Sequence, residues 1–466
     1  MNFFTKHLKD VGETYFEHAK NAAYFGINLF YASIAVFIHA LLPFVFLTTG
    51  SKTVKKLYNM MTARAEIASL SSKAKTKIVI IGFGASGLSC LLELVKNFNK
   101  KNHELVIDIF EKNFSSAKGL AYSTKNFSHI LNVDAGKMSI EIDDKDSFIN
   151  WLKNNNYSFE SSDFVPRVLY GLYLEDMTSK ALKIAGEKGI KCRFVNLEVE
   201  NLEVHNKLFV INNQAYHHLI LASGINLKNI QNNFWNCNLD QYLNDPEIYI
   251  AGAGLTAFDT IVSLIDKKYQ GKIFAYSRSG FVTKERTAYN QKSNPPLCLE
   301  DVNLPLSEIF HKFVKACKNS EQWQAIIDSM RPITQEFWIK LSLDKKKRFI
   351  RHCLKYWSVY RHRCPEKQFE KIRQLVAQNK LVFVKGKIEN KKFIDCTGLD
   401  FRAASVLMDN MTKSKLILKD DLDMGIVANV GNLYVIGALN FGSLLETTAI
   451  PDITKQAAEI GKKIYK

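Results

Sequence analysis

Two glycine-rich segments of the same design place the strongest constraint on how this 466-residue chain can fold. The first reads IVIIGFGASGLS, from Ile78 to Ser89, and the second reads IYIAGAGLTAFD, from Ile248 to Asp259. Each segment places G-x-G-x-x-G/A between an apolar run typical of a buried strand and a stretch of helical periodicity. The two segments therefore predict an α/β chain with two Rossmann-like domains.

The first segment carries glycines at all three positions of the pattern, Gly82, Gly84 and Gly87. The first glycine permits the tight turn, the second lets the backbone approach a pyrophosphate, and the third lets the helix pack against the strand. The next apolar run, LVIDIF, is followed by Glu111, where a carboxylate that binds a ribose 2'-hydroxyl is expected. This order predicts a dinucleotide site at the first turn.

The second segment repeats the order with Gly252, Gly254 and, at the third position, Ala257. Alanine is an accepted variant there because that position serves packing. After the next strand the chain offers Ser277 and Arg278 in place of an acid, which suits the 2'-phosphate of NADP better than NAD. Two dinucleotide sites in one chain favour FAD and a nicotinamide nucleotide, with hydride passing between them.

Three later segments indicate that the second Rossmann-like domain is inserted into the first. Tyr216–Gly224 and Lys391–Asp400 each read as a short buried strand that closes on a small-residue turn. Leu433–Ile436 predicts a further strand, followed by a glycine loop through Gly437 and a helix opened by Thr447 and Thr448, whose N-terminus suits the charge of a reduced flavin. The expected division is a membrane-anchoring segment at 1–72, an FAD domain at 75–230 and 385–466, and an NAD(P) domain with a helical insertion at 240–380.

An apolar segment near the N-terminus predicts membrane attachment. No Asp, Glu, Lys or Arg occurs from Asn21 to Ser51, and the 24 residues from Tyr24 to Leu47 are long enough, at about 1.5 Å each, to cross about 30 Å of hydrocarbon. Pro43 and two polar residues leave an in-plane or re-entrant anchor, and a soluble core helix, as alternatives. The lysines that follow the segment place the bulk of the chain at the cytoplasmic face of the bacterial inner membrane.

Charge and cysteine content narrow the function classes. A net charge of +17 favours an anionic lipid membrane as partner, because lysines flank the apolar segment. The sequence has no basic patch interleaved with aromatic residues, which is the pattern that would indicate nucleic-acid binding. The eight cysteines form no C-x-x-C pair and no zinc-ligand spacing, so we expect neither a dithiol relay nor a metal site.

The segment from Lys345 to Pro365, KKKRFIRHCLKYWSVYRHRCP, gathers the candidate catalytic residues. An imidazole beside arginines can bind an anionic substrate or transfer protons near neutral pH. The alternative is a basic helix whose aromatic residues pack inward. The candidates are Trp357, Arg361, His362 and Arg363.

From about Lys77 onward the chain resembles the bacterial FAD-NAD(P)-binding oxidoreductases, which are similar to flavin N-hydroxylating monooxygenases. The stretches that carry the resemblance are IGFGASG, GLAYSTKNFSHILNVDAGKMS, FVPRVLYGLYLED, GAGLTAFD, YSRSG, RFIRHCLKYWSVYRHRCP and GSLLETTAIPDI. The first sixty residues resemble a small bacterial membrane-associated domain of unknown function. One departure is Ala438 after Gly437, where many flavoproteins have aspartate.

The resemblance implies which residues hold each cofactor. FAD would be held by Gly82, Gly84, Ser86, Gly87, Glu111, Asn132, Met138, Ser139, Gly437, Thr447 and Thr448. The nicotinamide nucleotide would be held by Gly252, Gly254, Thr256 and Arg278. The sequence thus predicts a membrane-associated oxidoreductase that uses FAD and NADPH and acts on a small substrate, with monooxygenation as one candidate reaction. The rival hypothesis is a membrane-bound dinucleotide-binding scaffold or redox sensor.

Overall fold

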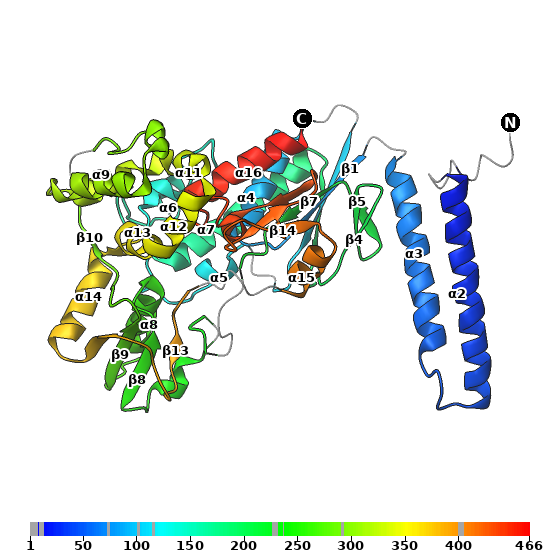
Figure 1. The fold of residues 1–466 in the computed structure, drawn as a ribbon, viewed down its shortest axis with the longest axis horizontal. Coiled ribbons are helices and arrows are strands. Elements are labelled where there is room, and N and C mark those ends of the chain that lie inside the picture. The colour runs from blue at the N-terminus through cyan, green and yellow to red at the C-terminus, as the bar shows by residue number, and fades with distance from the viewer. Residues whose placement is uncertain are drawn as a thin grey trace.

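A computed structural model describes residues 8, 14–71, 75–99, 103–113, 117–225, 232–235, 237–289, 293–398 and 405–466. It shows a helical hairpin at one end of the molecule, a large α/β domain in the middle, and a smaller α/β domain with a helical lobe at the other end (Figure 1). Asp400, the last residue of one predicted strand segment, and 226–230, at the end of one predicted domain, lie outside the described residues.

A five-stranded parallel sheet forms the centre of the large domain, in the order β16-β7-β1-β2-β3. Residue alternation along β1 decides what covers each face, because successive side chains point to opposite sides. Ile78 and Ile80 pack among helices, and Val79 and Ile81 pack against the opposite layer. The strands are β1 (Lys75–Ile81), β2 (Glu104–Phe110), β3 (Lys191–Val195), β7 (His218–Leu221) and β16 (Leu433–Val435).

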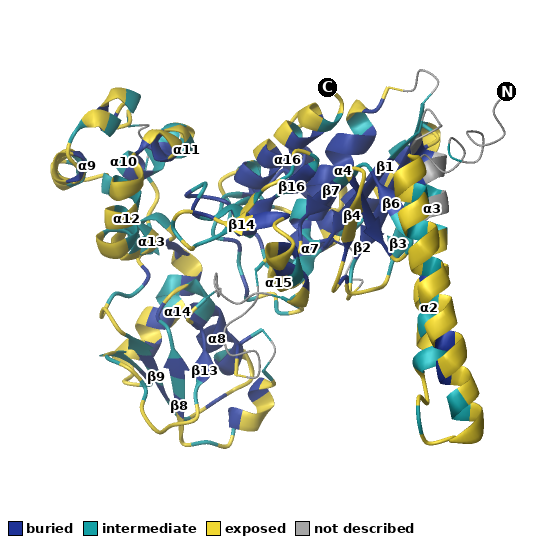
Figure 2. Cartoon of the chain, turned by 45° about the vertical axis from the view of Figure 1, so that its right-hand side comes forward, coloured by how far each residue is buried: buried dark blue, intermediate teal, exposed yellow. Residues whose placement is uncertain are grey.

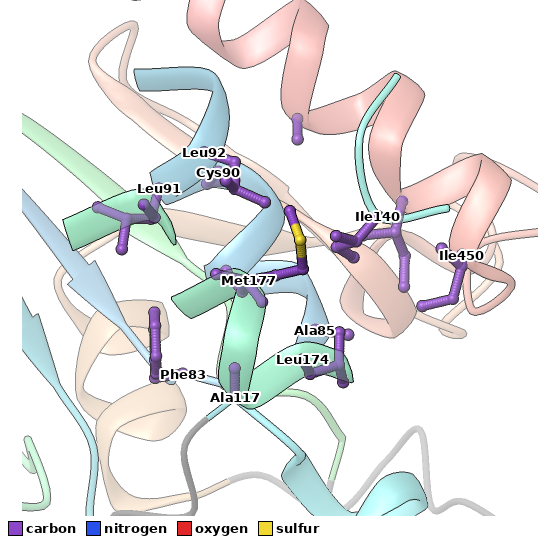
Figure 3. Close-up of a cluster of buried hydrophobic side chains, with 14 of the residues drawn as sticks. Phe83, Ala85, Cys90, Leu91, Leu92, Ala117, Ile140, Leu174, Met177 and Ile450 are labelled. Carbon is purple, nitrogen blue, oxygen red and sulfur yellow. The ribbon is translucent and has the colours of Figure 1, made fainter. Parts of the chain in front are cut away.

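Helices cover the Ile78 and Ile80 face of this sheet. Figure 3 shows side chains of α4, α7 and α16 meeting in this layer, with Met177 of α7 close to Cys90 of α4. The helices are α4 (Ala85–Asn97), α6 (Ser147–Asn154), α7 (Arg167–Glu187) and α16 (Ile450–Ile464), with the short segments α5 (Gly119–Tyr122), η1 (Ala135–Lys137) and η4 (Gly437–Asn440) beside them. Residues more than 350 positions apart in the chain therefore share one core.

The opposite face is covered by antiparallel strands and one helix. Phe209 and Tyr216 of the antiparallel sheet and Met411 of the helix are buried against the Val79 and Ile81 face. The elements are β4 (Glu203–His205), β5 (Leu208–Ile211), β6 (Gln214–Tyr216), α15 (Val406–Lys413), β14 (Ile417–Lys419) and β15 (Ile426–Ala428).

The smaller domain has a second parallel sheet, in the order β12-β9-β8-β13. Its strands are β8 (Glu247–Ala251), β9 (Lys272–Ser277), β12 (Leu381–Lys385) and β13 (Ile394–Asp395), and its helices are η2 (Leu239–Tyr242), α8 (Leu255–Asp266) and α14 (Glu366–Ala377). This sheet lies in sequence between β7 and β16 of the first sheet, so one Rossmann-like domain is inserted in the other, as predicted. Pairing of β13 with β8 carries the second sheet past residue 385, where the second part of the FAD domain was expected to begin.

A helical lobe extends from the smaller domain. It consists of η3 (Leu299–Asn303), α9 (Leu306–Lys318), α10 (Trp323–Ser329), α11 (Arg331–Lys340), α12 (Leu343–His352) and α13 (Leu354–Arg361), closed by the pair β10 (Glu285–Arg286) and β11 (Cys364–Pro365). Its core includes Trp338, Phe337 and, from the C-terminal segment of the large domain, Leu445. The lobe therefore contacts both α/β domains.

The N-terminal segment is a hairpin of two helices, α2 (Tyr15–Leu41) and α3 (Thr49–Ser71). The prediction of an apolar helix is confirmed, but its expected limits, Tyr24 to Leu47, are wrong. Thr14 and Glu17 form a capping box that starts α2 nine residues earlier, and the helix ends at Leu41 because a residue before a proline, here Pro43, disfavours helical backbone. Figure 2 shows that most of α2 is exposed.

The C-terminal half of α3 fixes the hairpin to the large domain. Ala63, Ile67 and Leu70 pack on Leu208 and Val210 of β5, which belong to the antiparallel sheet. By length and composition α2 is a candidate membrane span. Signal sequences and the core helices of soluble proteins meet the same two criteria.

Candidate functional site

The first glycine turn has no room for side chains at two of its three glycines. Gly82 has a φ of +93°, and a Cβ built on it would lie 2.6 Å from the carbonyl oxygen of Ala222, at the end of β7. A Cβ on Gly87 would lie 2.4 Å from the carbonyl oxygen of Gly82. Real Cβ atoms do not approach so closely, so these glycines let β1, β7 and α4 pack together.

The middle glycine of the first turn leaves open space. A Cβ on Gly84 would meet its nearest neighbour, the Cα of Gly119, at 3.6 Å, an ordinary contact. Gly84 is the N-cap of α4 and provides no side-chain cap, so the N–H groups of the first helical turn have no side-chain acceptor at the cap. Free N–H groups and the positive end of the helix dipole suit a phosphate, so this turn fits the pyrophosphate of a dinucleotide.

Glu111 lies immediately after β2, the strand next to β1, and is tied to the same turn. One carboxylate oxygen accepts a hydrogen bond from the N–H of Phe83 at 2.7 Å, and the other accepts one from the N–H of Asn113 at 3.1 Å. Glu111 and Gly82 line a cavity of about 360 Å³. The carboxylate is therefore held at the carboxyl edge of the sheet, where a ribose beside the pyrophosphate would lie.

The second glycine turn has the same geometry as the first. Gly252 has a φ of +125°, and a Cβ on it would lie 2.5 Å from the carbonyl oxygen of Cys396, which follows β13. A Cβ on Gly254 would meet nothing within 4 Å. As N-caps, Gly84 and Gly254 have nearly the same backbone angles, φ −90° and ψ −165° against φ −92° and ψ −170°. The second turn fits a second dinucleotide by the same argument.

Arg278 lies at the carboxyl edge that carries the second turn. The strands β8 and β9 are parallel neighbours with Ala251 opposite Tyr276, so Gly252 and Arg278 leave the sheet on the same side. Arg278 is exposed and Thr256, in the first turn of α8, is half-buried. The guanidinium is thus free to approach a nucleotide seated on the turn.

The residues predicted to line the flavin differ in what the fold lets them do. Met138 is buried in the main core, and Ser139 donates to the carbonyl oxygen of Glu141 at 3.0 Å and accepts from the N–H of Glu141 at 3.1 Å. Asn132 is half-buried and therefore has more accessible surface than Met138 and Ser139, which are buried. Among the three, Asn132 keeps the polar surface that a ligand needs.

The C-terminal segment returns to the first glycine turn. Gly437 has a φ of +75°, and a Cβ on it would lie 2.6 Å from the hydroxyl oxygen of Ser86 in α4. Thr447 is buried, and its hydroxyl finds no hydrogen-bond partner within the described part of the chain. Thr448 is exposed just before α16, whose N-cap, Ala449, offers no side-chain acceptor. An unpaired hydroxyl and an uncapped helix start fit a polar ligand edge.

Contacts between the two α/β domains include Asp259 and Ser263, which the sequence did not single out. Arg167 of α7 forms an ion pair of 3.0 Å with Asp259 of α8, and His129 lies 2.7 Å from the hydroxyl of Ser263. Burial lowers the pKa of His129, so a neutral imidazole sits in this interface. Asp259 carries a weak sequence signal, because it follows the second glycine turn and faces the core side of an apolar helix.

The predicted catalytic segment lies directly beside the C-terminal segment. Arg361 donates to both carboxylate oxygens of Glu446, at 2.8 and 3.2 Å, and Glu446 precedes Thr447. Arg363 is buried and donates to both oxygens of Asp328 at 2.6 Å. Both arginines therefore form ion pairs that position the end of α13. The alternative of a basic helix whose arginines face solvent does not describe them.

Asp328 is the centre of the charge cluster. Besides Arg363 it receives a hydrogen bond from the hydroxyl of Tyr289 at 2.7 Å and lies 3.7 Å from Arg286, which also pairs with Asp134 of the large domain at 3.1 Å. Burial alone would raise the pKa of Asp328, but Arg363, Tyr289 and the other arginines together lower it. The carboxylate stays ionised and joins the lobe to both domains.

His362 and Trp357 keep polar atoms available. His362 retains exposed surface, while the protein around it lowers its pKa to about 4, first by desolvation and then by the charge of Arg361. Its imidazole is therefore neutral near pH 7 and can donate one hydrogen bond and accept another. The indole N–H of Trp357 is buried without a partner among the described residues. In the described part of the chain no group of three or more His, Cys, Asp or Glu residues suits a metal ion.

Fold and site together define a two-dinucleotide flavoprotein architecture, and comparisons with known proteins agree. Residues 79–225 match the family model described as FAD-NAD(P)-binding, which confirms the predicted FAD-NAD(P)-binding domain. Residues 1–64 match a family of unknown function, DUF6356. No curated protein matches the chain.

Solved structures show the same fold over most of the chain. An ornithine N-hydroxylase of Kutzneria sp. 744 matches at 14% identity and a TM-score of 0.52, covering 84% of this chain and 99% of its own. A cadaverine monooxygenase of Erwinia amylovora, solved with FAD, matches at 11% identity and a TM-score of 0.53, covering 83% and 94%. The ornithine hydroxylase of Pseudomonas aeruginosa in its reduced form matches at 13% identity and a TM-score of 0.52, covering 84% and 98%. The chain therefore has an FAD/NAD(P)-binding fold like that of these flavin-dependent monooxygenases.

Replacing Gly84 and Gly87 separately by alanine is expected to separate the effect on cofactor binding from the effect on folding stability. Gly87→Ala places a methyl group against the Gly82 carbonyl and should lower the free energy of unfolding by about 1–3 kcal/mol. Gly84→Ala fits the apoprotein but fills the space that a pyrophosphate needs, so FAD affinity should fall at least about tenfold. Denaturant unfolding of apoprotein and titration with FAD measure the two effects. Equal FAD affinity of Gly84→Ala and wild type would contradict the assignment.

Removing the charge of Asp328 is expected to destabilise the lobe. Asp328→Asn leaves Arg363 buried beside a neutral amide, and breaking such a buried pair costs about 3–5 kcal/mol. Glu370→Gln, which removes an exposed ion pair with Arg373, is the matched control and should cost less than about 1 kcal/mol. Urea denaturation compares the two variants, and a similar small loss in both would show that the cluster contributes little.

Proposed function

We propose that this chain is a membrane-associated oxidoreductase that uses FAD and NADPH and acts as a monooxygenase on a small substrate. The observation that carries the proposal is the presence of two glycine turns with the same backbone geometry in one chain, each with an open space at its middle glycine. FAD is assigned to the first turn because the C-terminal segment, with Gly437 and Thr447, returns to it. The nicotinamide nucleotide is assigned to the second turn.

Bound FAD would supply the redox centre that accepts hydride from NADPH and passes electrons to oxygen. Residues of the chain itself would position the cofactor and the substrate. The N-terminus of α16 and the hydroxyl of Thr447 favour negative charge at the adjacent edge of a ligand. The neutral imidazole of His362, which follows Arg361 in the chain, is available to donate a hydrogen bond to a substrate. The Arg167–Asp259 pair keeps the two nucleotide domains in contact.

Arg278 supports NADPH over NADH as the reductant. It is exposed, lies on the same sheet edge as the second turn, and forms no hydrogen bond or ion pair with the described residues. A guanidinium in this position pairs with a 2'-phosphate.

Exposed apolar residues at the bend of the hairpin support membrane association. Leu41, Phe44 and Leu47 are 83%, 74% and 69% exposed at the end of the hairpin. The helices run antiparallel, so Lys56 on α3 reaches Tyr24 on α2, at 2.7 Å, beside the apolar segment. A helix pair that crossed the membrane would carry such lysines into hydrocarbon, at roughly 2.5–3.5 kcal/mol each near its centre.

We therefore propose that the bend enters one leaflet at the cytoplasmic face of the inner membrane, with the lysines of α3 at the anionic headgroups. The exposed lysines nearest the bend are Lys52, Lys55 and Lys56. This is the in-plane or re-entrant alternative to a spanning helix.

Substitution of Arg278 tests the choice of reductant. Arg278→Gln should raise KM for NADPH roughly ten- to hundredfold, because a charged hydrogen bond contributes about 1.5–3 kcal/mol, and should leave KM for NADH unchanged. Lys272→Gln, at the opposite end of β9, is the control and should change neither value. Steady-state oxidation of both nucleotides by FAD-loaded protein is the measurement. A wild-type enzyme that oxidises neither nucleotide favours the scaffold or sensor hypothesis.

Vesicle flotation tests the membrane proposal. Replacing Lys52, Lys55 and Lys56 together by glutamine should weaken binding to phosphatidylglycerol vesicles about a hundredfold, at about 1 kcal/mol per lysine. The matched control replaces Lys153, Lys183 and Lys367, which are exposed on other helices, and should bind like wild type. Equal loss in both variants would show a diffuse charge effect instead of a headgroup site on α3.

A further inference from the structure

The helical lobe contains an apolar cavity that the cofactor assignment does not use. Its volume is about 480 Å³, within the range of about 300–1,000 Å³ typical of small-molecule sites. Side chains from α9 to α13 line it, including Ile309, Phe313, Phe337, Leu341 and Trp357. Protein cores rarely leave voids larger than a water molecule, so a space of this size with apolar walls is shaped for a ligand.

The inner wall of the cavity belongs to the C-terminal segment assigned to the flavin. Leu445 lines the cavity and is followed by Glu446 and Thr447. Its N–H donates to the side-chain oxygen of Gln335 at 3.1 Å, so α11 and this segment form one wall. Trp357, whose indole N–H is unpaired among the described residues, also lines the cavity. The inner wall of the cavity therefore adjoins the segment assigned to the flavin.

The exposed residues of the cavity lining include both apolar and basic side chains. Phe310 and Tyr356, which are 41% and 38% exposed, and exposed Lys318 all line the cavity. Lys355 lies with its ammonium 5.2 Å from the centre of the Tyr356 ring. The described lining residues contain no carboxylate that would pair with a substrate ammonium. The opening therefore favours an anionic group over a cationic one.

We propose that this cavity binds the hydrocarbon chain of an anionic amphiphile, with the anionic group at Lys318. The inference rests on the proposed function in one respect, because it makes this amphiphile the substrate class of the oxidoreductase. Binding itself does not depend on the redox reaction.

Intrinsic fluorescence provides a readout of binding that is independent of turnover. Trp323, Trp338 and Trp357, three of the chain's five tryptophans, line the cavity. Full-length FAD-loaded protein in lipid nanodiscs is titrated with hexanoate, octanoate, decanoate and dodecanoate, with empty nanodiscs as the blank. Each added CH₂ should tighten Kd roughly three- to fourfold until the cavity is filled. Absence of saturable change with dodecanoate, or affinity that does not depend on chain length, would overturn the proposal.

Two variants with matched controls locate the site. Val314→Phe, which fills the cavity, should weaken dodecanoate binding at least about tenfold, whereas Val376→Phe, exposed on α14 away from the cavity, should not. Lys318→Gln should weaken binding of dodecanoate and leave that of dodecanol unchanged, with Lys371→Gln as its control. Equal affinities of Val314→Phe and Val376→Phe would overturn the site. If Val314→Phe fails to fold, the chain-length series with wild type decides alone.

The two levels of the proposal fail separately. Chain-length-dependent binding in a protein that NADPH does not reduce would support the cavity and reject the proposed function. Reduction by NADPH without fatty-acid binding would reject the substrate class and retain the oxidoreductase.

Discussion

The architecture depends on the close approach of a strand end to each glycine turn. The carbonyl of Ala222 lies against Gly82, and that of Cys396 lies against Gly252, at distances that leave no room for a Cβ. Each contact joins the turn to the strand beside it, and the chain returns from a distant segment to make it. The same packing leaves the middle glycine of each turn open, so the constraint that closes the fold also creates the space for a phosphate.

The helical lobe is held to this frame by ion pairs as well as by its apolar core, which includes Leu445 of the C-terminal segment. Asp328 connects Arg363 within the lobe to Arg286, and through Arg286 to Asp134 of the large domain. Paired charges of this kind fix geometry more than they add stability, because desolvation offsets much of the attraction. The lobe is thus positioned against the segment around Glu446, where the apolar cavity and the proposed redox site share a wall.

Local sequence patterns predicted much of the fold. Glycine spacing, apolar runs and Glu111 predicted two Rossmann-like domains, because each signal lies within one strand-turn-helix unit. The limits of the N-terminal helix were wrong because the capping box at Thr14 and the break before Pro43 outweighed hydropathy. The partners of Arg361 and Arg363 were not predictable, since Glu446 and Asp328 lie 85 and 35 residues away and no local pattern links them. The apolar cavity was missed for the same reason, because its walls come from five helices and the C-terminal segment.

Reduction of bound flavin by the second nucleotide is the most direct test of two dinucleotide sites that work together. FAD-loaded protein is mixed with NADPH without oxygen in a stopped-flow instrument, and the flavin absorbance is followed in time. Rapid bleaching by NADPH, with slower bleaching by NADH, is the result that two facing sites predict. If neither nucleotide bleaches the flavin, although FAD is bound, the second turn does not deliver hydride to the first, and the account of the chain as an oxidoreductase is contradicted.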